Sequence, residues 1–150
     1  MSITQIHTPQ TITDTLVVPI AADADDTRRA AHRLDLAGPA IAAARALGLS
    51  DRITILPGGF TWHPDGGHAS VHARVEVRVE PGAEDGSLLS ISTHFTPSDV
   101  ALRARLLDAW PVVKPLADAL VRRAARSVKA YAEEDRFEAG NEIASTAMAA

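Results

Sequence analysis

Three histidines lie close together in the sequence, and their spacing raises the question of a metal site. His63, His68 and His72 fall around a turn that contains Asp65, and the imidazole nitrogen is a common zinc ligand. From residue 71 to 80, apolar and polar residues alternate, which is typical of a strand with one solvated face. On such a strand His68 and His72 are about 13 Å apart, at about 3.3 Å per residue, whereas Zn–N bonds are about 2.0–2.1 Å long. The spacing therefore predicts no metal site.

The turn before this strand gives a second test of the same question. A loop of two or four residues within "HPDGGH" would set His63 opposite His68 in a β-hairpin. That register also places Phe60 and Trp62 on the apolar face of the hairpin. Two exposed imidazoles without a third ligand make a poor metal site, so we expect solvated histidines on an outer sheet face. His94, which alternates with apolar residues, is expected to point outward in the same way.

The first element that could position chemical groups is a strand over "TITDTLVVPI", residues 11–20. Its alternate residues Ile12, Leu16, Val18 and Ile20 share one apolar face. Asp14 falls on that same face, so its carboxyl group is one of the few polar groups expected near the core.

Two short helices are predicted next, over residues 25–36 and 39–47. Acidic residues at 23, 25 and 26 suit a helix N-terminus, where the dipole and free N–H groups favour negative charge. Gly38-Pro39 interrupts the helical pattern, and the proline can open the second helix. A strand at "DRITILP", the two arms of the hairpin and a last strand over 87–96 bring the expected number of strands to about five.

The remaining chain is predicted to be helical in two parts. Ser98 is expected to cap a helix that ends near Ala109. Trp110-Pro111 then makes a boundary, because the residue before a proline is disfavoured in the helical region. A long helix is expected from this proline to about Asp135.

The long helix has one apolar and one charged face. The apolar face comprises Val113, Leu116, Ala117, Leu120, Ala124, Val128 and Tyr131. The opposite face carries Asp118, Arg122, Arg126, Lys129 and Glu133. The i,i+4 pairs Asp118–Arg122 and Lys129–Glu133 are typical of a solvated surface. The apolar face needs a sheet to cover it, and the hairpin and last strand offer one dry face. The predicted fold class is therefore α+β, a curved antiparallel sheet around one long helix.

Composition excludes several classes of function. The net charge is −4 and the basic residues are scattered, which argues against a nucleic-acid partner. There is no cysteine, so there is no thiolate or disulfide chemistry. No signal peptide and no membrane span are recognisable, which favours a cytoplasmic protein. We expect one domain over residues 1–138, with 139–150 as a frayed tail.

The order of elements resembles the helix-grip fold of the START-like (SRPBCC) superfamily, which includes polyketide cyclases, aromatases and Bet v 1-like proteins. The last third of the chain is similar to the end of bacterial SRPBCC proteins of unassigned function. The matching positions are Ala104, Arg105, Leu107, Ala109, Trp110, Val113, Pro115, Arg123, Ala132 and Glu133. The chain departs from that pattern in its scarce aromatic residues and in having about five strands where full members have six or seven.

The resemblance implies a pocket between the sheet and the long helix for a small hydrophobic ligand, with no cofactor. The residues expected to bind that ligand are Phe60, Trp62, Ile91, Phe95, Trp110, Leu116 and Leu120. Apolar residues at such periodic positions also serve simply to fill a core.

Three functions stay open from the sequence. The first is a binding module for a small hydrophobic molecule. The second is an enzyme that resembles polyketide cyclases or aromatases, for which Asp14, Thr93 and Tyr131 are the candidate catalytic residues. The third is a protein-interaction domain with a filled core. A homodimer is compatible with all three.

Overall fold

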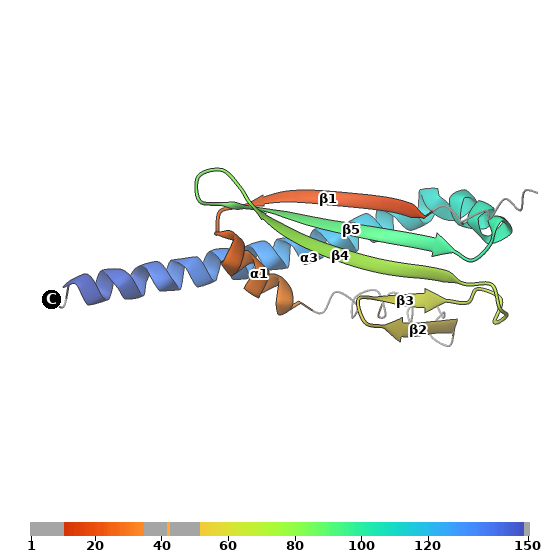
Figure 1. Ribbon diagram of the computed structural model, residues 1–150, viewed down its shortest axis with the longest axis horizontal. Coiled ribbons are helices and arrows are strands. Elements are labelled where there is room, and N and C mark those ends of the chain that lie inside the picture. Colours follow the sequence, from red (N-terminus) through yellow and green to blue (C-terminus); the bar gives the residue numbers. More distant parts are fainter. Residues whose placement is uncertain (1–10, 35–41, 43–51, 149–150) are drawn as a thin grey trace, which may run out of the picture.

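The computed structural model describes residues 11–34, 42 and 52–148 of the chain, with side chains described up to residue 140. Five strands form one antiparallel sheet in the order β1-β5-β4-β3-β2, and the long helix α3 lies across one face of it (Figure 1). The elements are β1 (Ile12–Ile20), α1 (Ala24–His32), β2 (Ile53–Leu56), β3 (Gly59–Trp62), β4 (Val71–Pro81), β5 (Ser87–Pro97) and α3 (Val100–Met148). The predicted α+β architecture is confirmed.

Strand β1 is an edge strand that pairs only with β5 among the described strands. Its burial alternates residue by residue, as the sequence pattern predicts, and Asp14 lies on the inner side together with Leu16. In the register of the two strands, Asp14 faces Thr93 and Leu16 faces Ile91. The inner face of this strand pair therefore carries two polar residues beside two aliphatic ones.

Helix α1 begins where the acidic residues predict. The side chain of Asp23 accepts hydrogen bonds from the backbone N–H groups of Asp25 and Asp26, at 2.9 and 2.8 Å, which is the geometry of an N-cap. The helix ends at His32, four residues earlier than the predicted end at 36. The second short helix predicted over 39–47 lies outside the described residues.

The β3–β4 hairpin has a longer connection than predicted. Trp62 pairs with Val71 and Phe60 with Ala73, so His63 does not lie opposite His68, and that prediction is wrong. The predicted loops of two or four residues are shorter than the observed connection. The backbone N–H of His63 donates a hydrogen bond to the carbonyl of Arg52, just before β2, the other neighbour of β3. The register differs by two residues, and an even shift leaves each side chain on its own face. The aromatic side chains therefore still lie on the inner side.

Helix α3 is continuous from residue 100 to 148 and contains both Pro111 and Pro115. The predicted boundary at Trp110-Pro111 is therefore wrong, and the segment expected to be a frayed tail, 139–150, continues α3 up to residue 148. Each proline removes one intrahelical hydrogen bond, but buried residues hold the helix on both sides of the two prolines, Leu106 before them and Ala125 after them. Tertiary packing thus overrides the local preference.

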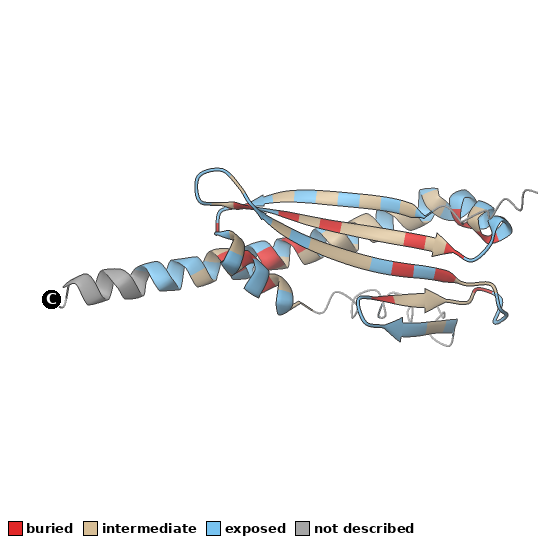
Figure 2. Cartoon of the chain, viewed as in Figure 1, coloured by how far each residue is buried: buried red, intermediate tan, exposed pale blue. Residues whose placement is uncertain are grey.

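Two apolar clusters hold α3 against the rest of the molecule. The α1-side cluster consists of Ile20, Ala22, Ala30, Leu89, Ile91, Ala125, Val128 and Ala132. The β3-side cluster consists of Val71, Ala73, Phe95, Leu102 and Leu106. Figure 2 shows the buried residues concentrated toward the two ends of the sheet and on the covering helices. Between Leu106 and Ala125, no residue of α3 is fully buried.

The buried face of α3 agrees with the predicted one at Val128, which is 1% exposed, and differs from it at other positions. Leu116 is 55% exposed and Tyr131 45% exposed, whereas Ala125 and Ala132 are almost fully buried. Leu120 is half-buried. The large side chains suggested one face, but alanines allow α3 to approach α1 closely, and these small residues make the contact. No described helix is long and apolar enough to span a bilayer.

Candidate ligand-binding cavity

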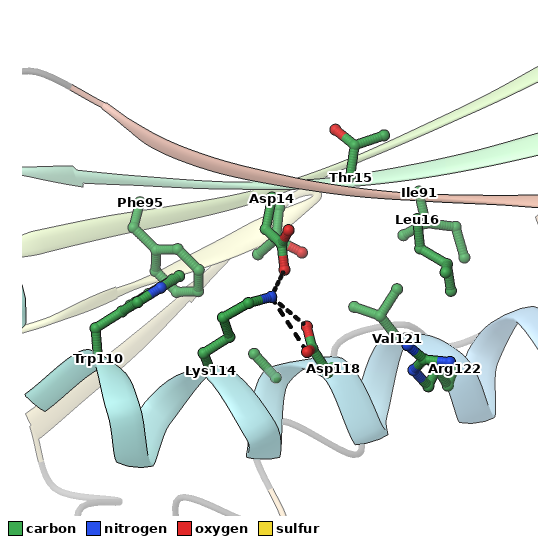
Figure 3. Close-up of a pocket in the computed structure, with 12 residues that line it drawn as sticks. Asp14, Thr15, Leu16, Ile91, Phe95, Trp110, Lys114, Asp118, Val121 and Arg122 are labelled. Carbon is green, nitrogen blue, oxygen red and sulfur yellow. Dashed lines mark hydrogen bonds and ion pairs between the residues drawn. The ribbon is translucent and has the colours of Figure 1, made fainter.

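A cavity of about 180 Å³ lies between the inner face of β1 and β5 and the middle of α3 (Figure 3). It occupies the stretch of α3 that neither apolar cluster fills. Its lining comprises Asp14, Thr15, Leu16, Ile91, Thr93, Phe95, Trp110, Lys114, Ala117, Asp118, Val121 and Arg122. Apolar side chains from both layers form half of the lining, and polar or charged side chains from both layers form the other half.

Local structure explains why these residues meet. Alternation along β1 and β5 brings every second residue inward, and steps of three or four residues bring one line of α3 toward the sheet. Ala117 stands at the centre of that line, and its methyl group is too small to fill the distance between helix and sheet. The cavity is therefore a consequence of a small side chain between two well-packed regions.

An aromatic pair lines the cavity. The rings of Phe95 on β5 and Trp110 on α3 have centroids 5.4 Å apart and planes at 79°, an edge-to-face contact. Trp110 is thus both a structural contact and a wall of the cavity. This places an indole ring where it can report on anything bound there.

A three-residue ion cluster spans the layers at the cavity. Lys114 Nζ lies 2.8 Å from Asp14 Oδ2 on β1 and 3.1 and 3.2 Å from the two carboxylate oxygens of Asp118. The side chains of Lys114, Asp14 and Asp118 are 42%, 39% and 35% exposed, so water screens them in part. The dashed lines in Figure 3 mark these contacts.

The cluster fixes the charge of its members. The hydrogen bond from Lys114 is the main cause that lowers the pKa of Asp14, and burial opposes it in part. The hydrogen bond to Asp14 is the main cause that raises the pKa of Lys114, followed by the bond to Asp118. At neutral pH the carboxylate and the ammonium group are therefore both charged, and neither titrates near neutrality.

The sequence of this protein matches no protein-family model and no curated protein. Among solved structures, it is similar to the di-domain ARO/CYC StfQ from the steffimycin biosynthetic pathway, with a TM-score of 0.50 and 16% identity over 85% of this chain and 52% of that one. The chain thus spans about half the length of StfQ.

Two further structures are similar at lower scores. A protein from Thermus thermophilus has a TM-score of 0.44 and 8% identity, over 83% of this chain and 99% of that one. The Zhui aromatase/cyclase from Streptomyces sp. R1128 has a TM-score of 0.38 and 12% identity, over 83% of this chain and 94% of that one. Together with the element order, the match to StfQ decides the architecture. The protein has the helix-grip fold of START-like proteins.

The helix-grip arrangement brings together some of the residues singled out in the sequence. Asp14, Thr93, Ile91, Phe95 and Trp110 all line the cavity. The remaining candidates do not line it: Phe60 and Trp62 pack on the β3-side cluster, Leu116 and Tyr131 are exposed, and Leu120 is half-buried. The roles of the lining residues in ligand binding stay predictions.

Sequence reasoning missed the charged residues of α3. Lys114, Asp118 and Arg122 follow one another at four-residue spacing and therefore lie along one line of the helix. The predicted pair Asp118–Arg122 does not form, because Asp118 bonds backward to Lys114. The signal that could have found this arrangement is Asp14, an inward carboxylate that requires a cationic partner on the covering helix.

The histidines of the opening pattern lie away from this cavity. His72 is on the outer sheet face, where its Nδ1 lies 3.3 Å from the hydroxyl of Thr61. His94 lies on the same outer face, with its Nδ1 3.1 Å from the hydroxyl of Thr13 and its Nε2 3.4 Å from a carboxylate oxygen of Glu76. Within the described part of the chain, no three His, Cys, Asp or Glu residues are grouped to hold a metal ion.

Proposed function

We propose that this helix-grip protein binds a small, largely apolar molecule in the cavity between β1, β5 and α3. The observation that carries the proposal is the position of the cavity between two packed clusters, with walls of Leu16, Ile91, Phe95, Trp110 and Val121. A molecule that fills the cavity would remove the apolar surface of these side chains, together with its own apolar surface, from water.

The size of the cavity limits the ligand. An apolar cavity of about 150 Å³ is large enough to hold benzene, and this one measures about 180 Å³. Pockets for drug-sized ligands are larger, about 300–1,000 Å³. We therefore expect a molecule with one ring or a short alkyl chain, and a multi-ring molecule would require the helix to move away from the sheet.

Binding of a neutral apolar probe tests the proposal directly. Toluene is titrated into a Trp62→Phe variant, in which Trp110 is the remaining tryptophan and lines the cavity. We expect saturable fluorescence changes at one probe per chain and a probe-dependent increase in melting temperature, because a ligand of the folded state stabilises it.

A matched pair of variants locates the site. Ala117 lines the cavity, whereas Ala119, two residues further along the same helix, is exposed. Ala117→Phe fills the space and should abolish toluene binding, while Ala119→Phe should leave it unchanged. Saturable binding that survives Ala117→Phe would place the ligand elsewhere. Absence of saturable binding in the parent protein would refute the proposal and favour the protein-interaction domain.

A second candidate function is catalysis, and the ion cluster favours it. Lys114, which stays protonated, could stabilise negative charge that develops on the oxygen of a bound carbonyl compound, while Thr93 and Asp14 line the same space. The reaction class would be proton removal next to a carbonyl, with the Asp14 carboxylate as the proton acceptor, as in a cyclase-like enzyme. Loss of α-hydrogens from cyclohexanone into deuterium oxide, followed by NMR, tests it. Exchange that is faster than in buffer, is lost in Lys114→Gln and persists in Lys129→Gln would support catalysis. An exchange rate equal to that in buffer alone would exclude catalysis with this compound.

A further inference from the structure

We infer that the ligand carries one anionic group, a carboxylate, and that Arg122 binds it at the mouth of the cavity. This inference rests on the proposed function and narrows it to a chemical class: small aromatic or short-chain monocarboxylic acids. The observations that support it are the unused hydrogen-bonding capacity at the mouth, the charges around it and the volume behind it.

Arg122 is a cavity-lining cation without a protein partner in the described part of the chain. Its side chain is exposed and lines the cavity near Val121 (Figure 3). No ion pair or side-chain hydrogen bond joins its guanidinium group to any described residue. By contrast, other arginines pair with carboxylates: Arg28, Arg29, Arg33, Arg78 and Arg105.

The neighbouring carboxylates are already engaged. Asp118, the natural i,i+4 partner of Arg122, places both its oxygens within 3.2 Å of Lys114 Nζ. The Asp14 carboxylate accepts a hydrogen bond from Lys114 Nζ. The acceptors at the mouth are thus occupied, whereas no described residue accepts a hydrogen bond from the five N–H donors of the Arg122 guanidinium group. A ligand group that binds Arg122 must therefore accept hydrogen bonds. A carboxylate can accept two parallel N–H···O bonds from one guanidinium group.

The same carboxylates limit the charge of the ligand. Asp14, Asp118, Lys114 and Arg122 sum to zero, so the mouth has no excess positive charge to hold a dianion. Asp14 and Asp118 repel any anion held by Arg122, and they repel a dianionic phosphate group more strongly than a monoanionic carboxylate. A monoanion with an apolar body therefore fits better than a phosphate ester, and the volume of about 180 Å³ accommodates a single ring or short chain behind it.

Three compounds with the same ring and different charge test the inference. Phenylacetate is an anion, 2-phenylethanol is neutral and phenethylamine is a cation at pH 7. Each is titrated into the Trp62→Phe protein with Trp110 fluorescence as the readout. We expect phenylacetate to bind about ten-fold or more tightly than the alcohol, because a charge-assisted hydrogen bond is worth that much in affinity. The amine should bind more weakly than either.

Two arginine variants decide which residue is responsible. Arg122→Gln should reduce phenylacetate affinity about ten-fold, to the level of the alcohol, without changing the binding of the alcohol. Arg126 is the matched control, one turn further along the same helix, where its Nε bonds to the backbone carbonyl of Arg122. Arg126→Gln should leave all three affinities within about two-fold, since it removes no cavity-lining group. Phenylacetate binding should also weaken with added salt while alcohol binding does not.

The outcomes separate this inference from the function on which it rests. Equal affinities for phenylacetate and the alcohol, or an unchanged phenylacetate affinity in Arg122→Gln, would overturn the inference and leave the apolar cavity in place. Tighter binding of phenethylamine would also overturn it and would point to the carboxylates as the recognition element. Failure of all three compounds and of toluene to bind would refute the proposed function itself.

Discussion

Lys114 Nζ on α3 lies 2.8 Å from the Asp14 carboxylate on β1, although the two residues are 100 positions apart in the chain. The contact joins the edge strand of the sheet to the middle of the helix that covers it. It lies at the cavity, where neither apolar cluster holds the two layers together. Its loss should therefore affect the cavity more than the rest of the fold.

The Asp14–Lys114 contact should contribute to stability at neutral pH, and this contribution should be lost at acidic pH. The pKa of Asp14 is below its ordinary value of 3.8, so the unfolded chain binds more protons around that pH than the folded one. This contribution is present above about pH 4 and is lost as pH falls through the lower folded pKa. We expect Asp14→Asn to flatten the decrease in melting temperature between about pH 4 and 2. Asp108 is an exposed residue of α3 that forms no ion pair among the described residues. Asp108→Asn is therefore the control and should leave the decrease in melting temperature unchanged. Identical profiles for Asp14→Asn and the parent would contradict the prediction.

Removal of Lys114 should raise the pKa of Asp14. The hydrogen bond and charge of Lys114 lower that pKa, and burial, which raises it, would remain. Lys114→Met keeps the length of the side chain without its charge. NMR titration of the Asp14 carboxyl carbon should show a higher midpoint in this variant than in the parent. Lys129→Met, which removes only the distant Glu133 pair, serves as the control and should give the parental midpoint.

The buried face of α3 can be tested with one charge at two positions. Val128 is 1% exposed and belongs to the α1-side cluster, whereas Leu116 is 55% exposed. Val128→Asp buries an unpaired carboxylate and should cost at least about 3 kcal/mol of unfolding free energy. Leu116→Asp should change it by no more than about 0.5 kcal/mol. Urea denaturation measures both, and a larger loss for Leu116→Asp would mean that the face is assigned wrongly.

Gly59 should resist even the smallest substitution. A Cβ atom at this position would overlap the carbonyl oxygen of Ala73 on the paired strand β4. Gly59→Ala should therefore separate β3 from β4 and reduce stability by about 1–3 kcal/mol. At Gly67, in the loop between these strands, an added Cβ meets nothing within 4 Å, so Gly67→Ala should be tolerated. Thermal melts that rank the two variants in the opposite order would argue against this pairing.

Zinc should not be required for folding. His72 lies on the outer sheet face opposite Thr61, and His63 precedes it across a longer loop than the sequence predicts. We expect the melting temperature to be unchanged by prolonged dialysis against EDTA and by later addition of zinc. Stoichiometric zinc that survives dialysis and is lost in His63→Ala would contradict this.

The sequence was most informative where burial alternates along one strand. The inward set of β1, including Asp14, and the alternation of β4 both follow from a period of two, and they predicted the sheet and its dry face. The β3–β4 register did not follow, because a shift by two residues keeps every side chain on its own face. The two registers differ only in the pairing itself, in which Trp62 lies opposite Val71 and Phe60 opposite Ala73.

The helix shows the converse limit. The large apolar side chains of Leu116 and Tyr131 place both residues on the predicted buried face, whereas Ala125 and Ala132 make the contact with α1. Periodicity indicates that one face of the helix is apolar. Which residues of that face are most deeply buried depends on the neighbouring element, here α1. The ion cluster was missed for a related reason. Lys114 has no visible role until Asp14 is placed opposite it, which requires the tertiary structure.

The separation of the two apolar clusters has a consequence for motion. The segment of α3 between them contains Pro111 and Pro115, each without an amide hydrogen, and no fully buried residue from 107 to 124. Local opening of this segment breaks few contacts, so its amide hydrogens should exchange with solvent faster than those around Val128. A molecule held in the cavity would contact both the sheet and this segment. Its binding should therefore slow that exchange, and the middle of the helix would become ordered together with its ligand.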